Sequence, residues 1–169
     1  MARLSDGSVE EQVARLVAIE EIKALRSRYW RFVDTKKWDD FGRLFATDAT
    51  FMDHAAQFGC NGREEIQGNI SAVLQPALSV HQGHQYEIEV LSDTTARGIW
   101  VMYDHLEFPP GPITPQDPYA GAHVDGWGHY LDEYVKVDGE WLFQTVNLYR
   151  LRLTVNSPSS TEYPPVPGS

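Results

Sequence analysis

Apolar residues recur at helical spacing through the first part of the chain. Ser8 and Glu11 have the spacing of a capping box, which predicts that a helix begins here. The apolar stripe of this helix consists of Val13, Leu16, Ile22, Leu25, Tyr29, Phe32 and Val33. The same spacing predicts a short second helix at 38–46 and a third at 63–74, which Pro76 ends. Residues 47–53 are expected to turn into a strand, and residues 59–62 to form a turn.

Alternating apolar and polar residues replace the helical pattern after residue 80. They predict four long strands, at 80–90, 96–106, 126–137 and 141–151. Segment 108–123 contains five prolines and is too long for a tight hairpin, so it is expected to cover a pocket mouth or to contact a second subunit. Helices followed by meandering strands indicate an α+β fold, in which an antiparallel sheet curls over the helices and encloses a small cavity.

Length and charge narrow the classes of protein. The chain has 169 residues, which fits one domain at 8–155 between a flexible N-terminus at 1–7 and a Pro-rich tail at 156–169. The net charge of −10 argues against nucleic acid or an anionic membrane as a partner. A single cysteine, Cys60, permits no intrachain disulfide, and the N-terminus lacks the apolar core of a signal peptide. We therefore expect a soluble cytoplasmic protein.

Two acidic residues stand at positions that are costly for a carboxylate. Asp34 lies near the C-terminus of the first helix, outside its apolar stripe, where a negative charge is unfavourable. Asp104 shares one strand face with Trp100, Met102 and Leu106, and a carboxylate on such a face needs a partner. Both are therefore site candidates. The alternatives are a solvated helix end for Asp34 and a buried structural acid for Asp104.

Two histidines stand near the start of the strand at 80–90. Histidine transfers protons near neutral pH with little tuning, although His81 and His84 can equally be half-buried residues with satisfied hydrogen bonds. Strict alternation places His84 on the same face as Tyr86, whereas a bulge at Gly83 would turn His81 inward. His129 is a further candidate on a later strand. The sequence contains neither a helical pair of histidines nor a pair of cysteines, so it does not predict a zinc site.

Four segments of the chain carry a family resemblance. They are 28–39, the run at 81–90 that begins His81-Gln82-Gly83-His84, 94–100 and 130–134. Through them the chain resembles the SnoaL-like branch of the nuclear transport factor 2-like superfamily over residues 8–153. Their spacing is most similar to that of the bile acid 7α-dehydratases, and more distantly to scytalone dehydratase and hexachlorocyclohexane dehydrochlorinase. The resemblance implies a cone-shaped α+β barrel, with three N-terminal helices packed on a strongly curved, mostly antiparallel sheet.

The resemblance also implies roles for individual residues. Asp34 and His81 match a catalytic dyad, and Tyr29 matches a hydrogen-bond donor to a substrate oxygen. Asp104 matches a further acid that lines the pocket. Arg150 matches an arginine on the last strand. Together with Arg150, His84, Trp100 and His129 are expected to contact the substrate, although the family pattern does not supply His129. For Arg150 the alternative is a surface salt bridge.

The implied activity is that of a cofactor-independent lyase, a dehydratase or related eliminase. Its substrate is expected to be small, apolar and cyclic, with hydroxyl or carbonyl groups, such as a steroid or polyketide. Elimination needs a base for the α-proton and an acid for the leaving oxygen, and the predicted site has both without a metal or an organic cofactor. A ketosteroid-isomerase-like enzyme and a non-catalytic binding protein of the same fold are the alternatives. Because a curved sheet leaves one face uncovered, we also expect a homodimer or homotrimer.

Overall fold

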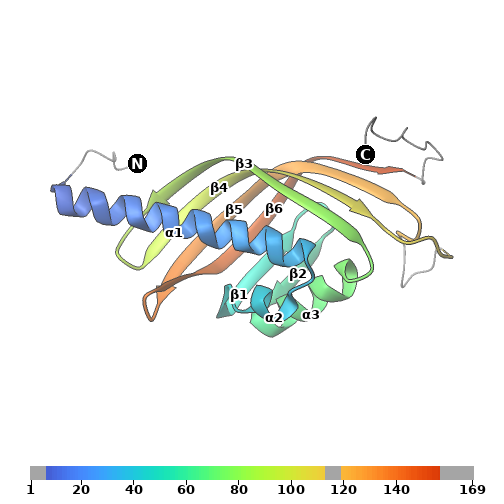
Figure 1. Cartoon of the computed structure of the whole chain (residues 1–169), viewed down its shortest axis with the longest axis horizontal. Coiled ribbons are helices and arrows are strands. Elements are labelled where there is room, and N and C mark those ends of the chain that lie inside the picture. Colours follow the sequence, from blue (N-terminus) through green and yellow to red (C-terminus); the bar gives the residue numbers. More distant parts are fainter. Residues whose placement is uncertain (1–6, 113–118, 157–169) are drawn as a thin grey trace, which may run out of the picture.

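The fold is α+β, with three helices packed on one strongly curved, six-stranded sheet (Figure 1). The computed structural model describes residues 7–112 and 119–156. The helices are α1 (Val9–Asp34), α2 (Trp38–Gly42) and α3 (Arg63–Leu74). The strands are β1 (Phe45–Asp53), β2 (Phe58–Asn61), β3 (Leu78–Val90), β4 (Thr95–Glu107), β5 (His123–Val137) and β6 (Glu140–Asn156).

The strands follow the order β2-β1-β6-β5-β4-β3 across the sheet. Neighbouring strands are antiparallel, apart from β1 and β6, which run parallel. The four consecutive strands β3 to β6 form the long meander that the alternating pattern predicts. In Figure 1, α1 crosses this curved sheet while α2 and α3 pack at its β1–β2 end. This arrangement confirms the expected fold class.

The first helix begins as predicted, but its first turns are more exposed than expected. Ser8 Oγ accepts the Glu11 N–H at 3.2 Å, and the Glu11 carboxylate accepts the Ser8 N–H at 2.7 Å. The prediction that Val13 and Leu16 face the core is wrong, because their side chains are 52% and 49% exposed. The N-terminal end of α1 projects beyond the strands, and burial begins only at Ala18 (Figure 1).

Two short elements differ from the sequence-based expectation. Helix α2 ends at Gly42 rather than at residue 46, because β6 already pairs with the chain at this point. Phe143 N–H donates to the Leu44 carbonyl at 2.9 Å, and Phe45 lies beside Phe143 in the sheet. Residues 58–61, most of which were expected to form a turn, are instead the edge strand β2, antiparallel to β1.

Aromatic rings fill the space between α1, α2 and the sheet. The Tyr29 ring lies 5.0 Å from that of Phe41 and 5.5 Å from that of Phe143, measured between centroids. Phe45 packs against the same two rings, at 5.1 and 5.4 Å. All four side chains are buried. The cluster closes one part of the cone, and Tyr29 stands at its boundary with the cavity described below.

Three segments lie outside the described residues. They are the expected flexible N-terminus up to residue 6, the Pro-rich tail from residue 157, and residues 113–118 in the middle of the long loop. Among the helices that the structure does describe, none combines the length and the apolar composition needed to cross a membrane.

Candidate active site

A cavity of about 400 Å³ lies between α1, α3 and the concave face of the sheet. Its volume and its largely apolar wall are typical of sites for small molecules. Besides tyrosines, four ionisable side chains line it: Asp53, His81, Asp104 and Arg150. They come from β1, β3, β4 and β6, so the cavity depends on strands from across the sheet.

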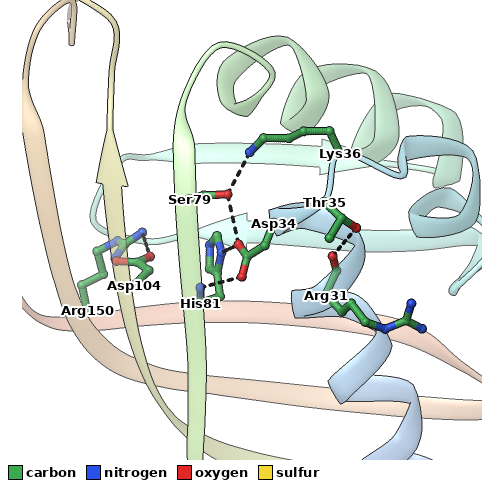
Figure 2. A network of polar contacts seen from close by, with 8 residues as sticks. All are labelled: Arg31, Asp34, Thr35, Lys36, Ser79, His81, Asp104 and Arg150. Carbon is green, nitrogen blue, oxygen red and sulfur yellow. Dashed lines mark hydrogen bonds and ion pairs between the residues drawn. The ribbon is translucent and has the colours of Figure 1, made fainter. Parts of the chain in front are cut away.

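Asp34, the last residue of α1, holds His81 by two bonds (Figure 2). Asp34 Oδ1 lies 2.6 Å from His81 Nδ1, and Asp34 Oδ2 accepts the His81 backbone N–H at 2.8 Å. The His81 side chain is only 6% exposed and lines the cavity, whereas Asp34 lies behind it. A carboxylate in this position favours the tautomer with the proton on Nδ1, which leaves Nε2 free to accept a proton.

The inward orientation of His81 depends on a bulge in β3. Between Gly83 and Tyr86 the register with β4 shifts by one residue, so that His81 lies opposite Asp104 and Tyr86 opposite Trp100. The one extra residue puts His81 on the concave face, as the bulge prediction required. Gly83 lies against Trp30, and any Cβ at this position would overlap that ring.

Ser79 of β3 is a further donor to Asp34, and Lys36 in the turn after α1 supports Ser79. Ser79 Oγ donates to Asp34 Oδ1 at 3.0 Å, and Lys36 Nζ donates to Ser79 Oγ at 2.8 Å (Figure 2). Lys36 adopts a left-handed backbone, with φ of 58°. Burial lowers the pKa of Lys36, and the nearby charge of Asp34 opposes this shift. The chain therefore fixes the carboxylate from three sides, which orients the imidazole in turn.

Tyr29 reaches the same cavity from α1, five residues before Asp34. Its side chain is buried beside Tyr130 of β5, with the two ring centroids 6.1 Å apart. Burial raises the pKa of Tyr29 to about 12, although the positive charge of Arg26 opposes the shift. The phenol therefore keeps its proton at neutral pH and can donate a hydrogen bond to a substrate oxygen.

Arg150 lies between two carboxylates on the same concave face as His81, whose partner across the strands is Asp104. Its Nη1 donates to Asp104 Oδ1 at 3.0 Å and its Nε to Asp53 Oδ2 at 3.2 Å. Its Nη2 lies 3.0 Å from the second oxygen of Asp104, which makes this contact bidentate. Asp53 is itself fixed by the backbone N–H groups of Ala55 and Ala56, at 2.9 and 3.1 Å. Arg150 is therefore not in the surface salt bridge that was its alternative.

The structure brings together five of the eight predicted site residues and leaves three elsewhere. Tyr29, His81, Asp104 and Arg150 line the cavity, with Asp34 behind His81. His84 is exposed within the β3 bulge, and His129 points to the outer face because it alternates with buried Gly128 and Tyr130. Trp100 is buried on the inner face but packs against Trp30 and Tyr134, away from the cavity wall. His84, Trp100 and His129 therefore do not line this cavity, and their expected contact with the substrate stays a prediction.

Among the polar residues of the cavity wall, Asp53 and Tyr130 were not predicted from the sequence. A signal existed for Asp53, because it shares a face with Phe51 in the expected strand and both are buried. A signal also existed for Tyr130, because the alternation that sends His129 outward sends Tyr130 inward.

The described ends of the long loop contribute to the cavity. Phe108 and Tyr119 both line it, and their rings stack with centroids 5.3 Å apart. This placement agrees with the expectation of a loop near the pocket mouth. Within the parts of the chain that the structure describes, no group of three or more His, Cys, Asp or Glu side chains is arranged to hold a metal ion.

Comparison with known proteins assigns the family. The model of the SnoaL-like domain matches residues 14–147, which is most of the chain. The chain therefore belongs to the SnoaL-like domain family.

Individual relatives are distant but similar in fold. "Probable cyclase FGR4" of Gibberella zeae is 21% identical over 140 residues, which cover 77% of this chain and 89% of that protein. The crystal structure of a hexachlorocyclohexane dehydrochlorinase, LinA type 2, superposes with a TM-score of 0.73 at 20% identity, covering 93% of this chain and 99% of the other. The structure of a candidate scytalone dehydratase from Novosphingobium aromaticivorans superposes with a TM-score of 0.70 at 21% identity, and the match covers 88% of this chain and 97% of the other. At these identities the two structures establish the fold alone.

Proposed function

We propose that the protein is a cofactor-independent lyase of the dehydratase type. Its substrate would be a small cyclic molecule with hydroxyl or carbonyl groups, such as a steroid or polyketide. The observation that carries this proposal is the two-point contact between Asp34 and His81, with the His81 ring on the wall of an apolar cavity. Proteins similar to this chain in fold or sequence include a dehydrochlorinase, a candidate dehydratase and a probable cyclase, which supports enzymatic activity of this general type.

His81 serves as the base in this mechanism. With Asp34 accepting from Nδ1, the free Nε2 removes a proton from the carbon next to the substrate carbonyl. The electron pair of the broken C–H bond forms the alkene, and the C–O bond of the leaving hydroxyl breaks. Asp34 stabilises the imidazolium that forms, since its carboxylate is already in contact with the ring.

Tyr29 serves as the acid. Because its phenol is protonated at neutral pH, it can donate its proton to the departing oxygen, which leaves as water. The proton gained by His81 then returns to Tyr29 and restores the resting state. Asp104 and Arg150 lie beside His81 on the same face of the sheet and orient the substrate toward His81 and Tyr29.

The same donors would also serve an isomerase. A protonated tyrosine beside a carbonyl stabilises an enolate, and His81 could return the proton to a different carbon of the substrate. The products distinguish the two reactions, because elimination releases water whereas isomerisation leaves the substrate mass unchanged. A binding protein of the same fold would give neither product.

A panel of hydroxylated steroids and aromatic polyketides tests the proposal, with ultraviolet absorbance reporting a new conjugated alkene. His81→Ala is expected to lower turnover about 10²- to 10⁴-fold while the protein stays folded. His84→Ala is the matched control, because His84 is exposed three residues along the same strand and should have little effect. A larger loss from His84→Ala than from His81→Ala would contradict the assigned base.

We further propose that the protein assembles as a homodimer or homotrimer through the outer face of the sheet. Apolar side chains on this face remain 37–42% exposed in the single chain: Ile99, Trp127, Leu131 and Tyr149. They lie on three adjacent strands, so they form a contiguous apolar surface rather than scattered exposures. Light scattering at micromolar concentration should report more than one subunit, and a clean monomer would contradict the proposal.

A further inference from the structure

The bridge between Asp104 and Arg150 crosses a whole strand. Asp104 is on β4 and Arg150 on β6, and β5 lies between these strands in the sheet. Side chains on alternate strands of a flat sheet are separated by about 10 Å at their backbones. The two charged groups nevertheless meet at 3.0 Å above the strand that separates them.

Gly126 of β5 makes this contact possible. A Cβ at this position would lie 2.0 Å from Arg150 Nη1 and 2.1 Å from Asp104 Oδ1, so any side chain would stand between the two groups. The backbone of Gly126 is outside the left-handed region, so other residues could adopt it. The requirement for glycine at this position is therefore one of space rather than conformation.

The bridge determines how Arg150 faces the cavity. All three guanidinium nitrogens contact carboxylate oxygens of Asp104 or Asp53. Burial lowers the pKa of Arg150, but the bonds and charges of these carboxylates outweigh it and raise that pKa. Two carboxylates, Asp53 and Asp104, surround the one guanidinium of Arg150. This part of the cavity wall therefore offers no unpaired positive charge to a ligand.

We propose that Gly126 is a specificity-determining residue that makes the cavity select uncharged ring compounds over carboxylate-bearing compounds of the same size. An anionic ligand would have to displace Asp104 or Asp53 from Arg150, or else lie beside their charges in a poorly hydrated cavity. This inference rests on the proposed function, because it names the substrate class of the same site. It is a statement about binding, and so its test does not depend on turnover.

Calorimetric titration with 2-naphthol and 2-naphthoate at neutral pH tests it, because the two probes are similar in size and differ in charge. The unmodified protein is expected to bind 2-naphthol at least about tenfold more tightly. Gly126→Ala should reduce this preference about tenfold or reverse it, because the added methyl separates Asp104 from Arg150 and exposes the guanidinium. Gly68→Ala is the matched control, since Gly68 lies on α3 with open space around its Cβ position and should leave the preference unchanged.

Asp53→Asn provides a second variant in case Gly126→Ala does not fold, which thermal melting would reveal. The amide keeps an acceptor for the N–H groups of Ala55 and Ala56 but removes one charge from Arg150, so the preference should shift in the same direction. Equal or tighter binding of 2-naphthoate by the unmodified protein would overturn the inference. Failure of both probes to bind, or an unchanged preference in both variants, would overturn it too. A protein that shows the predicted preference without any turnover would contradict only the lyase proposal.

Discussion

Two arginine–carboxylate pairs lie on the concave side of the same sheet, and they differ in what surrounds them. Arg26 of α1 contacts Asp132 of β5 at 3.0 Å, and neither side chain is exposed. Arg150 contacts Asp104 at the same distance, but Arg150 is 12% exposed and lines the cavity. The shortest N–O distance is the same in both places. The accessibility of the pair decides whether it belongs to the framework or to the site.

Aromatic rings seal the inner pair. The Arg26 guanidinium lies 3.8 Å from the ring centroid of Tyr130 and 4.5 Å from that of Tyr29. Tyr134 donates to the second oxygen of Asp132 at 2.7 Å, and Trp100 in turn donates to Tyr134. Tyr29 and Tyr130 also line the cavity, so each ring separates a buried charge from the substrate space. The framework pair thereby tunes the site, because the charge of Arg26 limits the rise in the pKa of Tyr29.

The largest effect on stability is expected from Asp132→Asn. Burial raises the pKa of Asp132 to about 6, so the carboxylate is ionised at about pH 8, and its loss there leaves Arg26 buried without a counter-charge. Urea unfolding at that pH should show a loss of about 3–5 kcal/mol. Asp138→Asn in the exposed β5–β6 turn is the control, with an expected change below about 0.5 kcal/mol. Equal losses in the two variants would show that the inner pair does not stabilise the fold.

A smaller loss is expected from Arg150→Met. The substitution leaves Asp104 and Asp53 without their cation, but water in the cavity can solvate them, so the cost should be about 1–3 kcal/mol. Arg152→Met serves as the control. Arg152 lies two residues further along β6, and its exposed side chain lies over the Trp127 ring. A loss larger than that of Asp132→Asn in the same urea experiment would reverse the proposed distinction between framework and site.

The smallest effect is expected at a third pair, on the outer face of the same strands. His105 Nδ1 lies 2.8 Å from Asp125 Oδ1, and this bond raises the pKa of His105. A histidine with a raised pKa stabilises the fold fully when the pH is below its ordinary pKa. This contribution is lost as the pH rises through the raised pKa. His105→Gln should therefore cost less than about 1 kcal/mol at about pH 5.5 and nothing near pH 9. Unfolding curves at both pH values check this, and a cost that grows with pH would contradict the assigned charge state.

Local rules predicted the parts of the fold that local sequence determines. The capping box at Ser8 and the alternation of β3 to β6 were sufficient for the main elements and their order. The predicted second helix was too long because Phe45 belongs to β1, which pairs with β6 about a hundred residues later in the chain. No local pattern contains that information. Strand β2 was missed for a different reason: its four residues are too few to show alternation, and Gly59 and Asn61 are typical of turns.

The candidate site was predictable where a residue violated its local pattern. Asp34 at a helix C-terminus and Asp104 on an apolar face both proved to have tertiary partners, His81 and Arg150. Arg26 was overlooked although it also violates its pattern, because it lies four residues after Ile22 and three before Tyr29 on the apolar stripe of α1. Its partner Asp132 comes from a strand that reaches α1 only through the curvature of the sheet.

The parallel pairing of β1 with β6 has a consequence for folding during synthesis. In the sheet order, β6 stands between β1 and β5, so the hairpin of β1 and β2 has no partner until the last strand has left the ribosome. Asp53 and Arg150, which meet in the cavity, are 97 residues apart. At synthesis rates of about 5–20 residues per second, the chain spends several seconds with the β1 edge open before β6 can close it. The apolar cavity wall is exposed throughout that interval, which makes the nascent chain a candidate for chaperone binding until its final strand is added.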